Sequence, residues 1–324
     1  MRNSSTTKPP IVSIITPSYN QGKYIEETIR SVLIQEGDFF IDYIIIDGKS
    51  TDCSVEIINK YESLVKEGTW PVQCEEIQYR WISEKDNGQA DAINKGFRMA
   101  EGDIVAWLNS DDTYLPGTFE KVVGFYETHH DAMFVYGKAY FIREDGKIFG
   151  EFPTGPFSYM KLAVTNFICQ PTTFFRKDVL NNGEQLNPNL QYALDYDFWI
   201  RMAEKFTFEF FPEFLSTFRI HVGSKTISPR QHYANEKESL MTVIRHYNWA
   251  PVNKVYGFSY NLIKYKFPDT LVRIKSVAVI ISLFVSLVLY IKLNKKIDRN
   301  DIKLVNMNNI RKLFKRRLDI ITGD

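Results

Sequence analysis

The chain has few cysteines and almost no net charge. Its 324 residues include three cysteines, Cys53, Cys74 and Cys169, with no CxxC spacing. This pattern supports neither a disulfide framework nor a zinc site, and it is typical of a reducing compartment. The formal net charge is +1, so the chain lacks the overall positive charge of many nucleic-acid-binding proteins. We therefore expect no nucleic-acid partner.

Two features that would indicate other classes of protein are also missing. The first ten residues, MRNSSTTKPP, hold no apolar run that could act as a signal peptide, so we expect the folded part to stay in the cytoplasm. The turn after the first apolar run reads PSYNQG. It lacks the GxGxxG pattern, which excludes the phosphate-binding turn of a nicotinamide or flavin enzyme.

Short apolar runs alternate with segments of helical periodicity over the first 150 residues. Strands are predicted at 11–16, 41–46, 79–83, 104–108 and 134–143. Helices are predicted at 23–35, from Ser50 or Thr51 as N-cap to 64, at 89–100, and to about 130 with Pro116 in the first turn. Farther on, we predict strands at 172–176, 208–211 and 215–220 and a helix at 196–205. The alternation predicts an α/β fold whose mostly parallel sheet has helices on both faces.

Polar residues follow four successive predicted strands. They are Tyr19-Asn20, Asp47, Asp86-Asn87-Gly88 and Asn109-Ser110-Asp111-Asp112. Ligands of such sheets bind beyond the carboxyl ends of the strands. The sequence therefore predicts a site at this edge of the sheet.

The acidic residues among them have two interpretations each. Adjacent carboxylates such as Asp111 and Asp112 can hold Mg²⁺ or Mn²⁺ and leave positions open to phosphate oxygens. They can also act as N-cap acids ahead of Pro116. Asp47 can accept hydrogen bonds from a nucleoside, or it can be a turn residue.

Four motifs resemble the family 2 glycosyltransferases. They are TPSYNQGKYIEETIRSVLIQ, IIIDGKSTD, SEKDNGQADAINKGF and AWLNSDD, and the resemblance covers about residues 10–225. It implies the GT-A fold, a Rossmann-like α/β fold, and a nucleotide-diphosphate sugar as donor, with uridine as the expected base. It also implies a divalent cation, Mn²⁺ or Mg²⁺, and transfer with inversion at the anomeric carbon.

The resemblance assigns donor contacts residue by residue. Thr16, Pro17, Tyr19 and Asp47 would line the nucleoside pocket. In the acid pair called DXD, Asp112 would hold the metal and Asp111 the ribose or sugar hydroxyls. Many relatives have Ala-Arg-Asn where this chain has Asp91-Ala92-Ile93-Asn94, and further donor contacts are predicted for Asp86, Gln89, Asp91 and Asn109.

The segment YALDYDFWIRMAEKF resembles the Glu-Asp element of the family, with Leu194 in place of the glutamate. The resemblance makes Asp195 the base that takes the proton of the acceptor hydroxyl, against the alternative of a helix N-cap. Asp197 falls in the first helical turn, where an acid favours the dipole.

Residues 219–226, RIHVGSKT, form the last predicted group. His221 resembles a late histidine that some relatives use as a second metal or diphosphate ligand, and its alternative is a structural hydrogen bond. Arg219 and Lys225 would neutralise the departing diphosphate. Gln170 to Phe174 would either shape the acceptor side or pack in the core.

The C-terminal part differs in composition. Residues 277–291 are uncharged and almost wholly apolar, and lysines and arginines flank them on both sides. As a helix this segment is about 22 Å long, shorter than the ~30 Å hydrocarbon core of a bilayer. A helix in the plane of the inner leaflet is favoured, and a membrane span and a buried helix are the alternatives. Residues 292–324 carry ten Lys/Arg and four Asp.

The expected organisation is a glycosyltransferase domain over 1–230 and a helical, membrane-associating region over 231–324. The expected place is the cytoplasmic side of the cell membrane, and the expected acceptor is a saccharide, free or lipid-linked, in bacterial surface polysaccharide assembly. Two alternatives remain. A metal-dependent nucleotidyltransferase should carry a Gly-rich basic loop after the first strand, and a sugar-binding membrane scaffold would need no base.

Overall fold

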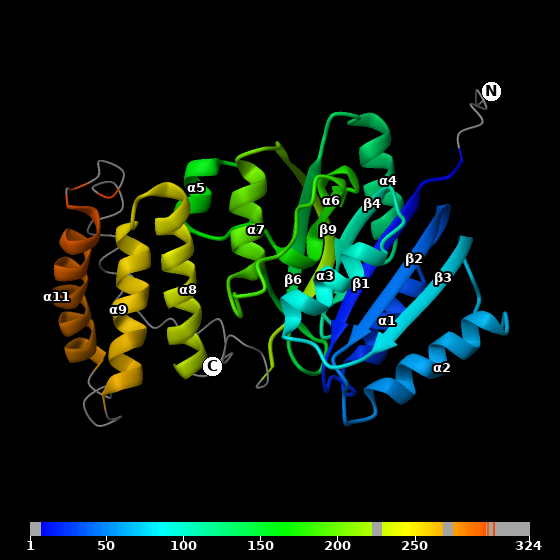
Figure 1. Cartoon of the computed structure of the whole chain (residues 1–324), viewed down its shortest axis with the longest axis horizontal. Coiled ribbons are helices and arrows are strands. Elements are labelled where there is room, and N and C mark those ends of the chain that lie inside the picture. The colour runs from blue at the N-terminus through cyan, green and yellow to red at the C-terminus, as the bar shows by residue number, and fades with distance from the viewer. Residues whose placement is uncertain (1–7, 222–228, 268–274, 296, 298–300, 302–324) are drawn as a thin grey trace. The chain divides into compact units, whose positions relative to one another are not determined.

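The computed structural model describes residues 8–221, 229–267, 275–295, 297 and 301. The chain forms two compact units (Figure 1). Unit 1 comprises Met1–Phe157, Phe167–Asn189 and Lys205–Arg219, and unit 2 comprises Ser158–Asn166, Leu190–Glu204 and Ile220–Asp324. This division does not follow one boundary at residue 230, because two earlier segments belong to unit 2.

Unit 1 is built on one mixed sheet, which has nine strands within the described residues. The strands are β1 (Ile11–Ser18), β2 (Gly37–Asp47), β3 (Cys74–Ser83), β4 (Ile104–Trp107), β5 (Thr113–Tyr114), β6 (Phe134–Ile142), β7 (Ile148–Glu151), β8 (Thr173–Arg176) and β9 (Phe208–Arg219). Their order is β3-β2-β1-β4-β8-β6-β9-β5, with β7 beside β6. β1, β2, β3 and β4 run parallel, so their carboxyl ends meet at one edge.

Helices cover both faces of this sheet. They are α1 (Ile25–Leu33), α2 (Ser54–Lys66), α3 (Gln89–Met99), α4 (Thr118–Thr128) and the short α6 (Asp178–Asn181), with a 3₁₀ turn at Gln170–Thr172. Val12 and Ile14 of β1 belong to the hydrophobic cluster that includes α1, α2 and α4 residues. Ile15 points to the other face, where a β-carbon on Gly96 would lie 2.3 Å from its Cγ2 atom. This close approach of α3 to β1 is possible only because Gly96 has no side chain.

The predicted α/β alternation is confirmed, and the local differences have physical reasons. The predicted cap of α2 is wrong, because the helix begins at Ser54 and the Ser50 hydroxyl binds Asp47 instead. Pro116 lies before the first turn of α4, since Gly117 adopts φ 73° at the N-cap. The two short strands predicted at 208–220 are one strand, β9, paired with β6 through shifts in register.

Unit 2 is helical in the part that the structure describes. It holds α5 (Tyr159–Val164), α7 (Leu194–Ala203), α8 (Pro229–Tyr247), α9 (Val252–Lys266) and α11 (Lys275–Asn294). Buried Leu240, Ala250, Val255 and Tyr290 form a hydrophobic cluster within this unit. The window Val277–Asn294 of α11 has a mean hydropathy of 2.2 and is long and apolar enough to cross a membrane.

Candidate active site

Asp47 organises the loop at the end of β2. The residue is fully buried. Its Oδ1 atom accepts a hydrogen bond from the Ser50 hydroxyl at 2.5 Å. Its Oδ2 atom accepts from the Ser50 backbone N–H at 2.9 Å and from the Ser83 hydroxyl at 2.7 Å. The carboxylate therefore joins the ends of β2 and β3, and both of its oxygens have internal partners.

The ends of β1, β2 and β3 converge at Gly48. A β-carbon there would lie 2.6 Å from Oδ2 of Asp86 and 3.3 Å from Cδ2 of Tyr19. The Tyr19 side chain is 61% exposed, so its ring is available to a ligand. Thr16 is buried, and its hydroxyl accepts a hydrogen bond from Tyr43 at 3.1 Å. Of the predicted nucleoside contacts, Tyr19 thus lies at the surface and Thr16 lies in the strand.

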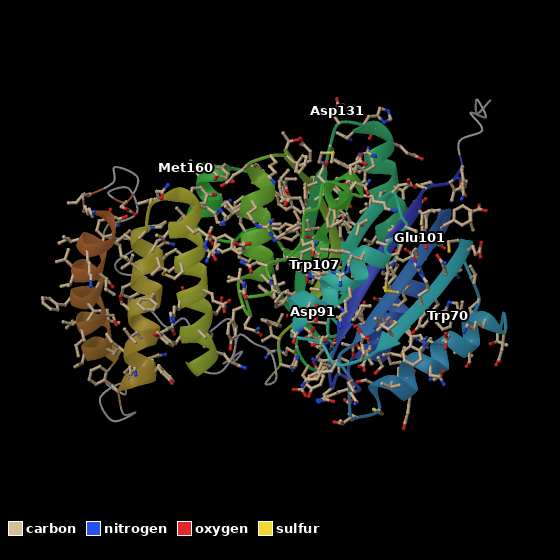
Figure 2. The ribbon with its side chains drawn as sticks, in the orientation of Figure 1. Trp70, Asp91, Glu101, Trp107, Asp131 and Met160 are labelled. Carbon is tan, nitrogen blue, oxygen red and sulfur yellow. The ribbon has the colours of Figure 1, made fainter. Side chains whose placement is uncertain are left out.

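The remaining predicted contacts on β1 and α3 also have defined positions. Pro17 is buried in β1. Asp86 accepts a hydrogen bond from the Gly88 backbone N–H at 2.9 Å. Asp91, labelled in Figure 2, accepts one from the Asn87 backbone N–H at 3.0 Å. The Asp86 and Asp91 carboxylates therefore fix the start of α3, which is where an acid complements the helix dipole.

A chain of amide groups crosses the edge of the sheet toward the acid pair. Gln89 Nε2 donates to Asn109 Oδ1 at 2.7 Å, and Asn109 Nδ2 donates to Gln170 Oε1 at 3.0 Å. Gln170 Nε2 in turn donates to the backbone carbonyl of Trp107 at 2.6 Å. Asn109 Nδ2 lies 3.5 Å from Oδ2 of Asp112. The amides hold Asn109 in one orientation beside the acids.

Asp112 is buried at the end of the loop after β4. Its Oδ1 atom accepts a hydrogen bond from the Arg219 backbone N–H at 2.9 Å. Burial raises the pKa of Asp112 well above its usual value, and the neighbouring Asp111 carboxylate raises it further. The ionised form of Asp112 is therefore unfavourable by itself, and a bound cation would relieve this cost.

The carboxylate pair fits a divalent cation in donor type. Carboxylate oxygens are the protein ligands that Mg²⁺ and Mn²⁺ prefer. Among the described residues, no group of three His, Cys, Asp or Glu side chains is placed to hold a metal ion.

Arg219 supports the loop that carries Asp111 and Asp112. Its side chain is buried. Its Nε atom donates to the backbone carbonyl of Asp111 at 2.9 Å, its Nη1 atom donates to that of Glu144 at 3.1 Å, and its Nη2 atom pairs with Glu27. The guanidinium lies over the Tyr24 ring at 5.3 Å from the centroid. These internal contacts give Arg219 a positioning role that its place in the sequence did not indicate.

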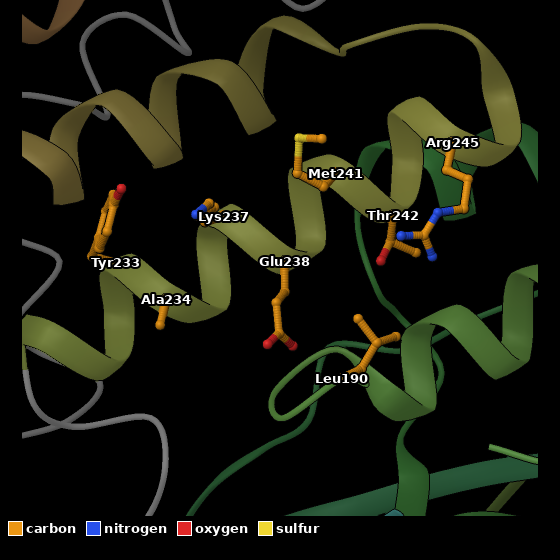
Figure 3. A pocket seen from close by; sticks show the side chains of 8 residues that line it. All are labelled: Leu190, Tyr233, Ala234, Lys237, Glu238, Met241, Thr242 and Arg245. Atoms are coloured by element: carbon orange, nitrogen blue, oxygen red, sulfur yellow. The ribbon is translucent and has the colours of Figure 1, made fainter. Parts of the chain in front are cut away.

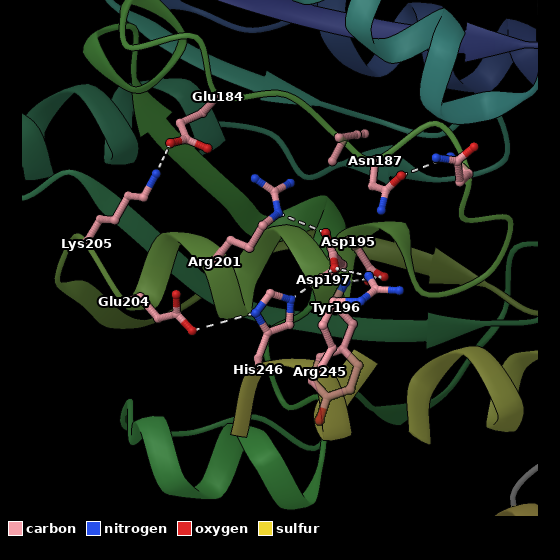
Figure 4. Close-up of polar contacts among 12 residues, drawn as sticks. Glu184, Asn187, Asp195, Tyr196, Asp197, Arg201, Glu204, Lys205, Arg245 and His246 are labelled. Carbon is pink, nitrogen blue, oxygen red and sulfur yellow. Dashed lines mark hydrogen bonds and ion pairs between the residues drawn. The ribbon is translucent and has the colours of Figure 1, made fainter. Parts of the chain in front are cut away.

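The two acids of α7 lie in unit 2 and differ in their surroundings (Figure 4). Asp195 accepts hydrogen bonds from the Tyr196 backbone N–H at 2.7 Å and from Asn166 Nδ2 at 3.3 Å. Asp197 is buried and accepts from Arg201 Nε at 2.9 Å and from His246 Nε2 at 3.2 Å. Burial alone would raise the pKa of Asp197, but these two hydrogen bonds hold it below its usual value. Asp197 therefore has a structural role and links α7 to α8 through His246.

The start of α7 is capped by a residue that the sequence analysis missed. The N-cap position is Ala193, so the N-cap interpretation of Asp195 is wrong. Glu238 of α8 instead accepts hydrogen bonds from the backbone N–H groups of Tyr192 at 2.7 Å and Ala193 at 3.1 Å. It also lines a cavity of about 440 Å³ beside Leu190 (Figure 3). A capping residue 46 positions away leaves no local signal in the sequence.

The last predicted group, residues 219–226, lies partly outside the residues that the structure describes. His221 is a buried residue of unit 2. Lys225 lies outside the described residues.

Comparisons with known proteins agree with this architecture. The model of the family "Glycosyl transferase family 2" matches residues 13–183. A putative teichuronic acid biosynthesis glycosyltransferase of Bacillus subtilis is 31% identical over 219 residues, which are 66% of this chain and 81% of the relative.

Two solved structures show the same fold. TarS of S. aureus in complex with UDP-GlcNAc has a TM-score of 0.55 at 17% identity, over 87% of this chain and 81% of that chain. A mannosyltransferase of Pyrobaculum calidifontis in complex with GDP-Man and Mn²⁺ has a TM-score of 0.52 at 14% identity, over 95% and 82%.

The sheet and the helices on its two faces define a GT-A fold of the glycosyltransferase type. The chain belongs to glycosyl transferase family 2 and is a glycosyltransferase.

Proposed function

We propose that the enzyme moves a sugar from a nucleotide-diphosphate donor, with uridine as the base, to a hydroxyl of a saccharide or lipid-linked acceptor, with inversion. The observation that carries this proposal is the convergence of four strand ends on one edge, with the carboxylates of Asp111 and buried Asp112 after the fourth. Relatives named for polysaccharide synthesis support the class of acceptor, and a fold neighbour solved with UDP-GlcNAc supports the class of donor.

The donor would lie along the exposed ends of β1 to β4. Tyr19 and Asp86 flank Gly48 and would contact the nucleoside, while buried Thr16, Pro17 and Asp47 hold that loop in shape. Asp111 would bind ribose or sugar hydroxyls.

The amide side chains and acids around α3 would complete this contact surface. Gln89 and Asn109 present an ordered amide pair beside the acid pair, and Asp91 fixes the turn before α3.

A divalent cation, Mn²⁺ or Mg²⁺, would bind at Asp112, and Asp111 would remain a contact for hydroxyls of the donor. When bound, the cation would neutralise charge on the diphosphate, which grows as the leaving group departs. Lys225 would add positive charge there. Arg219 contributes indirectly, because its contacts fix the backbone that carries the acids.

The chemical step is a single displacement, and Asp195 acts as the base. The acceptor oxygen attacks the anomeric carbon and gives its proton to the Asp195 carboxylate. The bond from that carbon to the phosphate oxygen breaks, and the nucleoside diphosphate leaves with the bonding electrons. Glu238 and Asn166 hold Asp195 and its helix in place.

The setting that we propose is the cytoplasmic face of the cell membrane. The apolar helix α11 and the basic residues after it would keep the enzyme beside lipid-linked acceptors. Bacterial surface polysaccharide assembly is the corresponding process.

The test measures release of free nucleoside diphosphate from a panel of nucleotide sugars with Mn²⁺ and candidate acceptors. We expect release with a UDP-sugar and its loss in Asp112→Asn and Asp195→Asn. Asp145→Asn serves as the matched control, because this acid lies in the exposed turn after β6. Release of pyrophosphate would instead indicate a nucleotidyltransferase, and binding without turnover would indicate a scaffold.

A further inference from the structure

Helix α11 has two different faces. Large apolar side chains lie exposed on one of them, at positions three and four residues apart. These are Ile280, Leu283, Phe284, Leu287, Val288 and Ile291, with exposed fractions from 37% to 69%. We call this set the apolar stripe. It follows the 3.6-residue period of a helix, so it forms one continuous face about 16 Å long.

The opposite face is packed within unit 2 by small and polar residues. Ser282 and Ser286 are buried, and each hydroxyl binds the backbone carbonyl four residues earlier. Tyr290 is buried in the cluster that includes Val255 of α9. The two helices lie side by side in Figure 1. One face of α11 is thus packed within unit 2, and the apolar stripe on the other face is exposed.

A buried acid fixes the end of this helix. Asp301 accepts hydrogen bonds from Trp249 Nε1 at 2.8 Å and Tyr290 OH at 2.5 Å through Oδ2, and from the Val252 backbone N–H at 2.8 Å through Oδ1. Asp301 thus joins Tyr290 of α11 to Trp249 and Val252 at the start of α9. If α11 left α9 to cross a bilayer, the carboxylate would lose its bonds to one of the two helices, so the contacts favour α11 against α9.

Basic side chains stand at both ends of the stripe, and aromatic side chains stand at one of them. Asn294 at the end of α11 binds the backbone of Ala250 before α9, so the two helices are antiparallel. The last turn of α9, with Lys264 and Lys266, therefore lies at the start of α11. Exposed Tyr265 and Phe267 accompany these lysines, and exposed Lys292 and Lys295 follow the stripe at its other end.

We infer that α11 lies flat on an anionic lipid surface, with the apolar stripe in the acyl chains, the lysines on the headgroups and its other face kept on α9. Apolar side chains between basic ends, with aromatic residues beside one of them, are typical of helices in the membrane interface. The same lysines disfavour a second copy of the chain as the occupant, because like charges would face each other. The inference rests on the proposed function in one respect, the lipid-linked acceptor, and gives the geometry of docking.

Vesicle flotation tests docking without donor or acceptor, so its result is independent of sugar transfer. The full chain is mixed with vesicles of phosphatidylcholine with and without phosphatidylglycerol. We expect binding to the anionic vesicles that weakens with salt. Phe284→Glu with Leu287→Glu should reduce partitioning about a hundredfold, and Lys292→Glu with Lys295→Glu roughly tenfold or more.

Met241→Glu is the matched control, because Met241 is an exposed apolar residue of α8 outside the stripe. It should leave partitioning within about twofold of wild type. All these side chains are exposed, so the melting temperature should stay unchanged and loss of folding is separable from loss of binding. Equal binding by wild type and the stripe variant would overturn the inference. So would a stripe-dependent dimer that does not bind vesicles.

Nitroxide labels distinguish a flat helix from a spanning one. They are placed by Ile280→Cys, Phe284→Cys and Ile291→Cys in a background in which the three native cysteines are replaced. A helix in the interface gives the same depth of immersion at all three positions. A depth that changes steadily from position 280 to 291 would show a span and would overturn the inference.

Discussion

The backbone N–H of Arg219 donates a hydrogen bond of 2.9 Å to Oδ1 of Asp112, across 107 positions of the chain. The end of β9 is thereby fixed to the acid pair after β4. The Arg219 side chain reaches on to the carbonyl of Asp111 and to Glu27 of α1. The carboxylates of the candidate site are held in place by a residue from the far end of the sheet.

Replacement of this arginine should impair both stability and transfer. Arg219→Lys keeps the positive charge and loses the planar group that donates to several carbonyls. We expect the free energy of unfolding to fall by about 1–3 kcal/mol and kcat to fall by about tenfold to a hundredfold. Urea unfolding and steady-state kinetics measure the two effects. Arg98→Lys, at an exposed position of α3, is the control. If the two variants had the same kcat, Arg219 would have no positioning role in transfer.

A methyl group at Gly48 should weaken donor binding. In Gly48→Ala the new carbon would meet Asp86 Oδ2 at 2.6 Å, so the carboxylate and the neighbouring Tyr19 must move. We expect KM for the donor to rise by about tenfold with a smaller change in kcat.

Gly124→Ala is the control for this substitution, because a β-carbon there meets nothing within 4 Å. In the interior of α4 it should raise stability by about 1 kcal/mol. Unchanged donor KM in Gly48→Ala would contradict the placement of the nucleoside at this loop.

The stability of unit 2 should depend on pH through Asp197. The groups around its carboxylate are Arg201 of α7 and Arg245 and His246 of α8. The pKa of Asp197 is held below its usual value, so the ionised form contributes stability above the pKa of the unfolded chain, about 3.9. This stability is lost as the pH falls through the lower pKa of the folded state.

Melting temperatures of wild type and Asp197→Asn, measured from neutral to acid pH, test this dependence. The variant should be less stable by about 3 kcal/mol at neutral pH, and the difference should shrink as the pH falls. A difference that stays constant down to the lowest pH would show that the charge of Asp197 is not the cause.

Glu238 should influence turnover through Asp195. Its carboxylate binds the backbone N–H groups that precede α7, so Glu238→Ala leaves them without a partner. We expect kcat to fall by about tenfold, with donor KM unchanged. Lys237→Ala, at the neighbouring exposed position, should retain activity. A rise in donor KM with kcat unchanged would place Glu238 in donor binding instead.

The first half of the fold was predictable from the sequence because its signals are local. Apolar runs such as 41–46 lie in buried strands, and each ends where a polar residue begins the next loop. Parallel strands then bring Asp47 and the loop after β4 to the same edge without any knowledge of side-chain contacts.

The supporting contacts were not predictable, because each joins distant positions. Arg219 reads in the sequence as a free cation, yet it is buried among carbonyls contributed by other loops. Glu238 reads as a surface acid of a helix, yet it caps α7. The sequence shows the charge and the hydrogen-bonding capacity of these two side chains. Tertiary packing decides which groups they bind.

Isothermal titration of the full chain with UDP, with and without Mn²⁺, tests whether a cation joins the donor to this edge of the sheet. We expect tight binding that requires Mn²⁺, a loss of affinity of at least about tenfold in Asp112→Asn, and no loss in Asp145→Asn. Binding of UDP that is equally tight without Mn²⁺ and in Asp112→Asn would contradict a cation held by the acid pair at this edge of the sheet.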